Sequence, residues 1–388
     1  MSLLASQMAT GQLAVRGRTV YTMEGPPISN GIVLIRNGLI QEVGSESSVK
    51  IPSGYTVVEA KVVTPGLIDS HAVVWSTSFF NPLPKRDLMA MLTAIDHYNE
   101  KKSLCRFYWD DGVTTIQTDR DDKRLVDGQL MVVKTKGDVD NEAAVVKPFS
   151  MLAVTLGETY IDAPEYPRIE RRQIFTRLRA ELRNLSARPT AGRTSKTSRG
   201  RGSDARSNAL RRVLKREIPL LVSVESLAEA TAAIQLGREF NLDVVLDANR
   251  AAYQSTTRTI LGKVAMIADT YLNGPGWGVR KQNVAEAAVL KSRSAPVALQ
   301  SGGTRYVSKG SILRSEARQA MMDGLSLEEA LALLTVNPAR ILGIDKKTGS
   351  IAEGKAADLA LFDGAPFDSA THTVGVIIDG VVVYRPKD

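Results

Sequence analysis

Cysteine, histidine and long hydrophobic runs are scarce in this sequence of 388 residues. A single cysteine, Cys105, excludes an internal disulfide bond and fits a reducing compartment. No apolar run approaches the roughly 20 residues that a membrane-spanning helix needs. The first residues, MSLLASQM, lack the regions of a signal peptide, although a chain whose leader had been removed would look the same. With 43% hydrophobic and 24% charged residues, the composition predicts a soluble, globular, cytoplasmic protein.

The chain contains only three histidines, His71, His97 and His372. Catalytic zinc sites use three protein ligands, most often histidines. His97 is expected in a helix and His372 in a C-terminal strand region. The histidine supply therefore argues against a catalytic zinc centre.

Positive charge is in excess by +8 and is concentrated between residues 168 and 216. Residues 186–207 are rich in Gly, Ser, Thr and Arg, have no apolar period and contain no aromatic residue for base stacking. We expect a disordered basic surface loop there. Binding of an anionic polymer through this loop is an alternative function, and nucleic acid is the less favoured ligand.

Both ends of the chain predict short strands with turns. Asn37-Gly38 and Asp379-Gly380 each lie between two apolar runs, which is typical of β-hairpins. Neither end has enough strands for an independent sheet. We therefore expect residues 1–65 and 340–388 to form one small β-sandwich.

Residues 66–339 alternate apolar strands with helical patterns. This alternation predicts an α/β fold with parallel strands, most economically a (β/α)8 TIM-type barrel. The carboxyl ends of barrel strands carry the functional groups. The expected strands are 113–116, 130–133, 151–155, 220–224, 243–247, 263–267 and 296–300, in addition to one that begins near Leu67.

Several segments carry a resemblance to a known family. They are VVTPGLIDSHAVV (62–74), TVNPARILG (335–343) and TGSIAEGKAADL (348–359). Together they resemble the amidohydrolase superfamily, in which such segments enter and leave the barrel. DGVTT (111–115), GQLMVVKTKG (128–137) and LGE (156–158) are similar to its imidazolonepropionase-related branch.

The resemblance implies a metal held by two strand-one histidines, often a carbamylated lysine, histidines on strands five and six, and an aspartate on strand eight. Strand one supplies His71, but Val73 stands at the second histidine position, and Gly302 stands at the aspartate position. The expected vestigial pocket consists of Asp69, His71, Val73, Lys134, Ser223, Glu225, Asp247, Asn249, Gln300 and Gly302. Lys134 follows an apolar run and is expected at the surface, and Glu225 and Asp247 can equally serve as helix-cap or salt-bridge residues.

These substitutions predict a metal-free pseudoenzyme that acts as a binding or scaffold subunit. An active amidohydrolase relative, a second copy of the chain or a small-molecule ligand is the expected partner, and no cofactor is expected. The alternative is a C–N hydrolase for a cyclic amide or related small molecule. Its atypical divalent metal would be held by His71 with Asp69, Glu225 and Asp247, and oxygen ligands of this kind favour magnesium, calcium or manganese.

Overall fold

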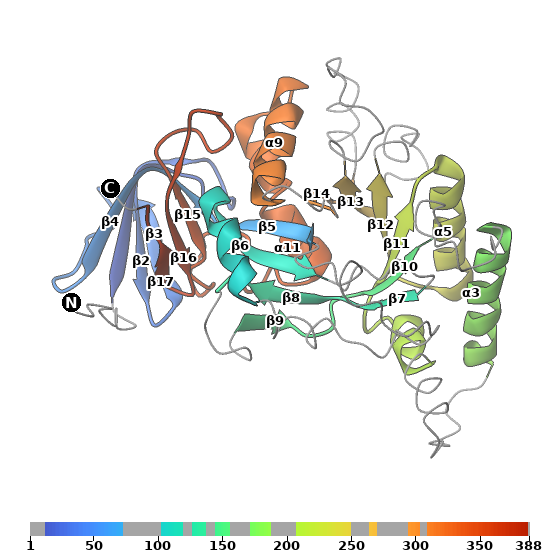
Figure 1. The fold of residues 1–388 in the computed structure, drawn as a ribbon. Helices are drawn as coiled ribbons and strands as arrows, with labels where there is room; N and C mark the ends of the chain where they lie inside the picture. The colour runs from blue at the N-terminus through green and yellow to red at the C-terminus, as the bar shows by residue number, and fades with distance from the viewer. Residues whose placement is uncertain are drawn as a thin grey trace.

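The computed structural model describes residues 12–72, 102–118, 126–136, 144–155, 171–187, 207–249, 264–269, 294–302 and 309–386. The fold is mixed α/β, with three hydrogen-bonded sheets (Figure 1). No helix in the described ranges is long and apolar enough to cross a membrane.

The first sheet, called here the terminal sheet, joins the two ends of the chain as predicted. Its order is β17-β16-β15-β4-β1-β2-β3. The strands are β1 (Leu13–Val20), β2 (Ile28–Arg36), β3 (Leu39–Ser45), β4 (Thr56–Pro65), β15 (Leu359–Phe362), β16 (Thr373–Ile378) and β17 (Val381–Tyr384). The join is the antiparallel pairing of β4 with β15, in which Pro65 lies opposite Leu359.

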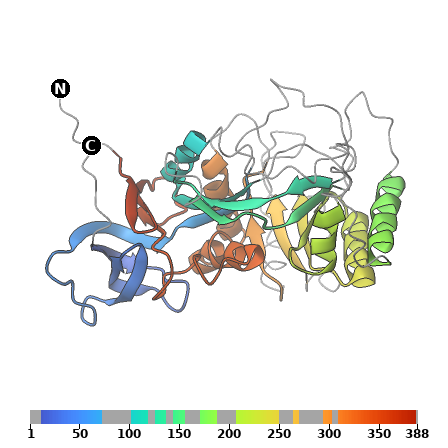
Figure 2. The same ribbon diagram turned by 90° about the horizontal axis from the view of Figure 1, so that it is seen from below.

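Instead of two separate sheets, the terminal sheet is one continuous sheet that curls on itself (Figure 2). The two predicted hairpin turns have positive φ angles, 54° and 80° at Asn37-Gly38 and 46° and 74° at Asp379-Gly380. Both hairpins are held by the segment before β15, because the Ile40 amide donates to the Lys355 carbonyl and the Gly380 amide donates to the Ala357 carbonyl. The curled sheet encloses an apolar cluster that includes Val15, Val33, Ile35, Val63 and Leu361.

Two further sheets, called here the central sheets, lie beside the terminal sheet (Figure 1). One has the order β14-β13-β12-β11-β10-β7 and the other β5-β6-β8-β9. Their strands are β5 (Leu67–Ala72), β6 (Val113–Thr118), β7 (Val126–Gln129), β8 (Met131–Lys134), β9 (Val145–Lys147), β10 (Leu152–Thr155), β11 (Leu220–Val224), β12 (Val244–Asn249), β13 (Ala265–Asp269) and β14 (Val297–Leu299). The two sheets are connected by a parallel bridge between Ala72 and Gly302 and by the chain that runs from β7 into β8.

Parallel pairing is confirmed between β5 and β6 and along β10 to β14, but the prediction for residues 130–133 is wrong. The run from Val126 to Lys134 is antiparallel to both β6 and β10. Only residues 119–125 separate β6 from this run. A parallel crossover needs a dozen or more residues, so this connection is too short to return the chain in the same direction.

Helices cover the outer face of the central sheets (Figure 1). They are the 3₁₀ helix η2 (Lys102–Asp111), α3 (Arg171–Ser186), α5 (Leu227–Phe240), α9 (Lys309–Met322) and α10 (Leu327–Ala332), and a further helix, α11 (Val336–Leu342), follows α10 in the chain. The predicted capping box is present, since Ser326 Oγ accepts from the Glu329 amide and the Glu329 side chain accepts from the Ser326 amide. Helix α11 differs in position, because Ala339 and Leu342 pack against the opposite face, with Ile68, Leu221 and Val245.

Gly66 allows the chain to pass closely from the terminal sheet into β5. A Cβ atom at this position would lie 2.7 Å from the Thr114 Cβ and closer still to the other side-chain atoms of Thr114. We expect Gly66→Ala to lower the free energy of unfolding by about 1–3 kcal/mol, because a well-packed interior cannot take the extra methyl group without shifting. Urea unfolding measures this effect. Gly25→Ala is the matched control, since a Cβ at Gly25 would meet no atom within 4 Å, and equal losses in both variants would contradict the expectation.

Candidate functional site

The carboxylate of Asp247 is the centre of a polar network at the ends of the central strands. Asp247 lies on β12, directly opposite Ser223 of β11. Its Oδ2 atom accepts a hydrogen bond from Ser223 Oγ at 2.9 Å and lies 3.2 Å from His71 Nδ1 of β5. Its Oδ1 atom accepts from Gln300 Nε2, just beyond β14, at 2.6 Å. One side chain therefore connects groups from four strands.

The network fixes the charge of Asp247. Burial raises the pKa of the Asp247 carboxyl group. The hydrogen bond and the charge of His71, together with hydrogen bonds from Gln300 and Ser223, lower this pKa by more than burial raises it. The net pKa is below the ordinary value for aspartate. Because the His71 and Asp247 side chains are only 14% and 12% exposed, the carboxylate is held ionised in a largely dry environment.

A second carboxylate, Asp69, closes the seam between β5 and β14. Its Oδ2 atom accepts from Ser301 Oγ at 2.5 Å, and its Oδ1 atom accepts from the Ser301 and His71 amides at 3.1 and 3.2 Å. Asp69 is fully buried. Ser70 Oγ donates to the Leu299 carbonyl across the same seam. Asp69 therefore serves as an acceptor within the seam.

The structure brings His71, Ser223, Asp247 and Gln300 into direct contact and places Asp69 and Gly302 at the adjoining seam. Sequence reasoning did not include Ser301 in the pocket. Its position directly after Gln300 at a strand end was the only available signal.

Three residues of the predicted pocket are not shown in contact with Asp247. The Glu225 amide donates to Glu229 Oε2 at 2.7 Å, so this strand end is tied to the first turn of α5. Val73 and the side chain of Asn249 lie outside the described residues, as does His97.

Lys134 requires a correction, because it is neither at the surface nor in contact with the Asp247 network. It is 5% exposed, and its ammonium group pairs with Asp358 at the start of β15. Asp358 also accepts from Thr348 Oγ1 at 2.6 Å and from the Asp379 amide at 3.0 Å. The apolar run of β8 is buried on both sides, so its last residue is drawn between the central sheets and the terminal sheet.

The donor set does not fit a catalytic metal. Within the described ranges, no group of three or more His, Cys, Asp or Glu side chains is placed to hold an ion. His372 belongs to the terminal sheet, is 79% exposed and lies 3.4 Å from Asp363. The His71 and Asp247 side chains already bind each other, so a metal would have to displace those hydrogen bonds.

Several basic side chains in the described part of the basic run pair with acidic ones. Arg179 and Arg183 pair with Glu239, Arg212 pairs with Glu217, and Arg216 pairs with Asp243. These pairs favour a solvated charged surface. Residues 188–206, which contain most of the predicted basic loop, lie outside the described residues, so anionic-polymer binding stays a prediction.

Two sequence comparisons point to the same group of proteins. A profile described as "Amidohydrolase family" matches residues 300–384. Imidazolonepropionase of Mesorhizobium japonicum is 25% identical over 358 residues, which cover 87% of each chain. Imidazolonepropionase of Agrobacterium fabrum is 28% identical over 153 residues, which cover 38% of this chain and 35% of that relative.

The fold is shared with solved amidohydrolase structures. An amidohydrolase from Thermotoga maritima superimposes with a TM-score of 0.79 at 22% identity, covering 96% of this chain and all of that one. Molinate hydrolase superimposes with a TM-score of 0.58 at 14% identity, covering 96% and 94%. The profile and the two relatives support membership of the amidohydrolase superfamily.

Proposed function

We propose that this protein is a metal-free pseudoenzyme of the amidohydrolase superfamily that acts in the cytoplasm as a binding or scaffold subunit. The central sheets would form a (β/α)8-type barrel, and the terminal sheet would form the accessory sandwich. The observation that carries the proposal is that both carboxylate oxygens of Asp247 are already bound by the side chains of His71, Ser223 and Gln300. A site whose acidic centre is filled by the protein's own donors has no open coordination position for a hydrolytic metal.

The scaffold role is supported by how well the polar groups at the strand ends are satisfied. A buried carboxylate without partners would cost several kcal/mol, about 1–3 kcal/mol for each missing hydrogen bond and more for the charge. Here Asp69 and Asp247 each accept three hydrogen bonds. The fold can thus persist without the metal and present its surface to an active relative or to a second copy of the chain.

Metal analysis tests the proposal. The protein is expressed with added zinc and manganese, purified without chelator and analysed by plasma mass spectrometry. Imidazolonepropionase of Mesorhizobium japonicum, prepared in the same way, is the reference. We expect well below one tightly held transition metal per chain, because catalytic sites need about three protein ligands around the ion. One metal per chain that disappears in His71→Ala would overturn the proposal.

A second candidate function is C–N hydrolysis without a conventional metal. It is favoured by the contact between His71 and Asp247, because a carboxylate that orients an imidazole is a common arrangement for general base catalysis. It would act on a cyclic amide or related small molecule. Turnover of a panel of cyclic amides, lost in both His71→Gln and Asp247→Asn but kept in Asp243→Asn, would establish this function in place of the first.

A further inference from the structure

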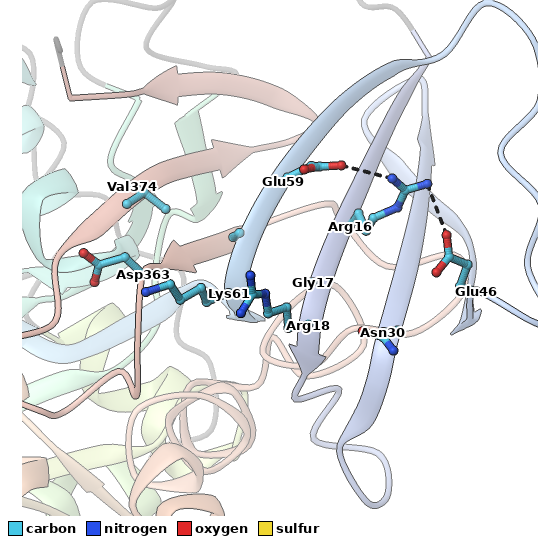
Figure 3. Close-up of a pocket in the computed structure, with 10 residues that line it drawn as sticks. Arg16, Gly17, Arg18, Asn30, Glu46, Glu59, Lys61, Asp363 and Val374 are labelled. Atoms are coloured by element: carbon cyan, nitrogen blue, oxygen red, sulfur yellow. Dashed lines mark hydrogen bonds and ion pairs between the residues drawn. The ribbon is translucent and has the colours of Figure 1, made fainter.

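A hollow of about 450 Å³ lies on the outer face of the terminal sheet (Figure 3). Strands β1, β2, β4 and β16 and the residues that directly follow β3 and β15 supply its walls. The hollow is lined by Arg16, Gly17, Arg18, Asn30, Glu46, Glu59, Ala60, Lys61, Asp363 and Val374. None of these residues belongs to the Asp247 network.

At one end of the hollow one guanidinium group lies between two carboxylates. Arg16 of β1 lies opposite Glu59 of β4, and its guanidinium group is 3.0 Å from the Glu59 carboxylate. The same guanidinium group is 3.4 Å from the carboxylate of Glu46 (Figure 3). This end therefore has no surplus positive charge.

At the other end two cations face each other across neighbouring strands. The pairs Gly17–Ala60 and Thr19–Val62 place Arg18 opposite Lys61. Like charges in this position destabilise a sheet unless something lies between them. The Lys61 side chain extends toward Asp363, and no ion pair to a described carboxylate joins Arg18 (Figure 3). The guanidinium group of Arg18 is thus the uncompensated charge of the hollow.

A neutral polar residue, Asn30 of β2, follows in register beside Arg18. The pairs Gly17–Gly31 and Thr19–Ser29 place Asn30 opposite Arg18 on its other side. The positive φ angle of Asn30, 48°, interrupts the regular strand there, and the Asn30 side chain lies apart from Arg18 (Figure 3). The guanidinium group of Arg18 and the ammonium group of Lys61 can both donate hydrogen bonds to one acceptor group.

We propose that Arg18 and Lys61 bind the single anionic group, phosphate or carboxylate, of a small molecule. The planar fork of Arg18 suits two oxygens of such a group, and Lys61 adds a point charge. The remaining wall carries the carboxylates of Glu46, Glu59 and Asp363. These carboxylates repel a second anionic group, so the site excludes dicarboxylates and polyanions.

Calorimetric titration tests this site with inorganic phosphate, acetate and succinate at low ionic strength and constant chloride. We expect saturable binding of phosphate or acetate in the millimolar range, and the difference between the two identifies the preferred anion. Succinate should bind no better than acetate. Arg18→Gln combined with Lys61→Gln should weaken binding by about tenfold or more, because two charge-assisted contacts are lost.

Arg16→Gln combined with Glu59→Gln is the matched control, because it also removes two charged side chains from the hollow but leaves its net charge unchanged. This control should bind as the wild type does. All four positions are at or near the surface, and circular dichroism checks that each variant is folded. No saturable heat up to about 10 mM anion, or equal weakening in the two double variants, would overturn the proposal.

Discussion

Replacement of Asp247 by leucine is expected to lower the free energy of unfolding by about 3–5 kcal/mol. The substitution removes the acceptor for three donors that come from different strands, and it leaves those donors buried without partners. Asp247→Asn keeps the shape and one carbonyl oxygen, so about 1–3 kcal/mol is expected. Urea unfolding followed by fluorescence and circular dichroism measures both losses.

Asp243 provides the matched control at the base of the same strand. Its carboxylate pairs with Arg216, but the two side chains are 43% and 50% exposed. Asp243→Asn is therefore expected to cost only about 0–1 kcal/mol. If the asparagine variants at positions 243 and 247 lost the same stability, Asp247 would not be the centre of the network.

The pH dependence of the free energy of unfolding is a second measure of how much Asp247 stabilises the fold. The pKa of Asp247 is lower in the folded chain than its ordinary value, so its contribution to stability is present above pH about 4 and is lost as the pH falls through the folded-state pKa. Between pH 6 and pH 3 the wild type should therefore lose more stability than Asp247→Asn. The other carboxylates titrate in both proteins and cancel in the comparison.

Local sequence chemistry predicted much of the fold. The positive φ angles at Asn37-Gly38 and Asp379-Gly380 and the capping box at Ser326 depend on a few adjacent residues, and all are present. Alternation of strands and helices also predicted which residues share the strand ends. His71, Asp247 and Gln300 meet because the carboxyl ends of parallel strands lie at one edge.

Contacts between distant segments could not be predicted in this way. The partner of Lys134 is Asp358, which is 224 positions away, and no local pattern indicates that pairing. The antiparallel direction of residues 126–134 follows from a short connection, whereas an apolar run alone indicates only a strand. Ser301 was missed because a serine beside a glycine-rich turn has no periodic signal that marks it as the partner of Asp69.

Loss of the ion pair between Lys134 and Asp358 is expected to have an effect as large as that of Asp247. Their side chains are 6% and 0% exposed, so removal of Lys134 leaves the buried Asp358 carboxylate without this cation, and removal of Asp358 leaves Lys134 with the more distant Asp379 carboxylate at 3.6 Å. We expect Lys134→Met and Asp358→Asn each to lower the free energy of unfolding by about 3–5 kcal/mol. The pair joins β8 to the beginning of β15, and its loss should therefore weaken the attachment of the terminal sheet to the central sheets.

Lys136→Met is the control for this prediction, because the Lys136 and Asp379 side chains are 14% and 32% exposed and so less buried than the Lys134–Asp358 pair, and a smaller loss of about 1 kcal/mol is expected. The single variant Asp358→Leu and its combination with Lys134→Met complete a double-mutant cycle. The double variant should lose less than the sum of the single losses, since an apolar pair of similar volume can replace a buried ion pair. Strict additivity would mean that the two side chains stabilise the junction independently, and the ion pair would then not be what holds the two parts of the chain together.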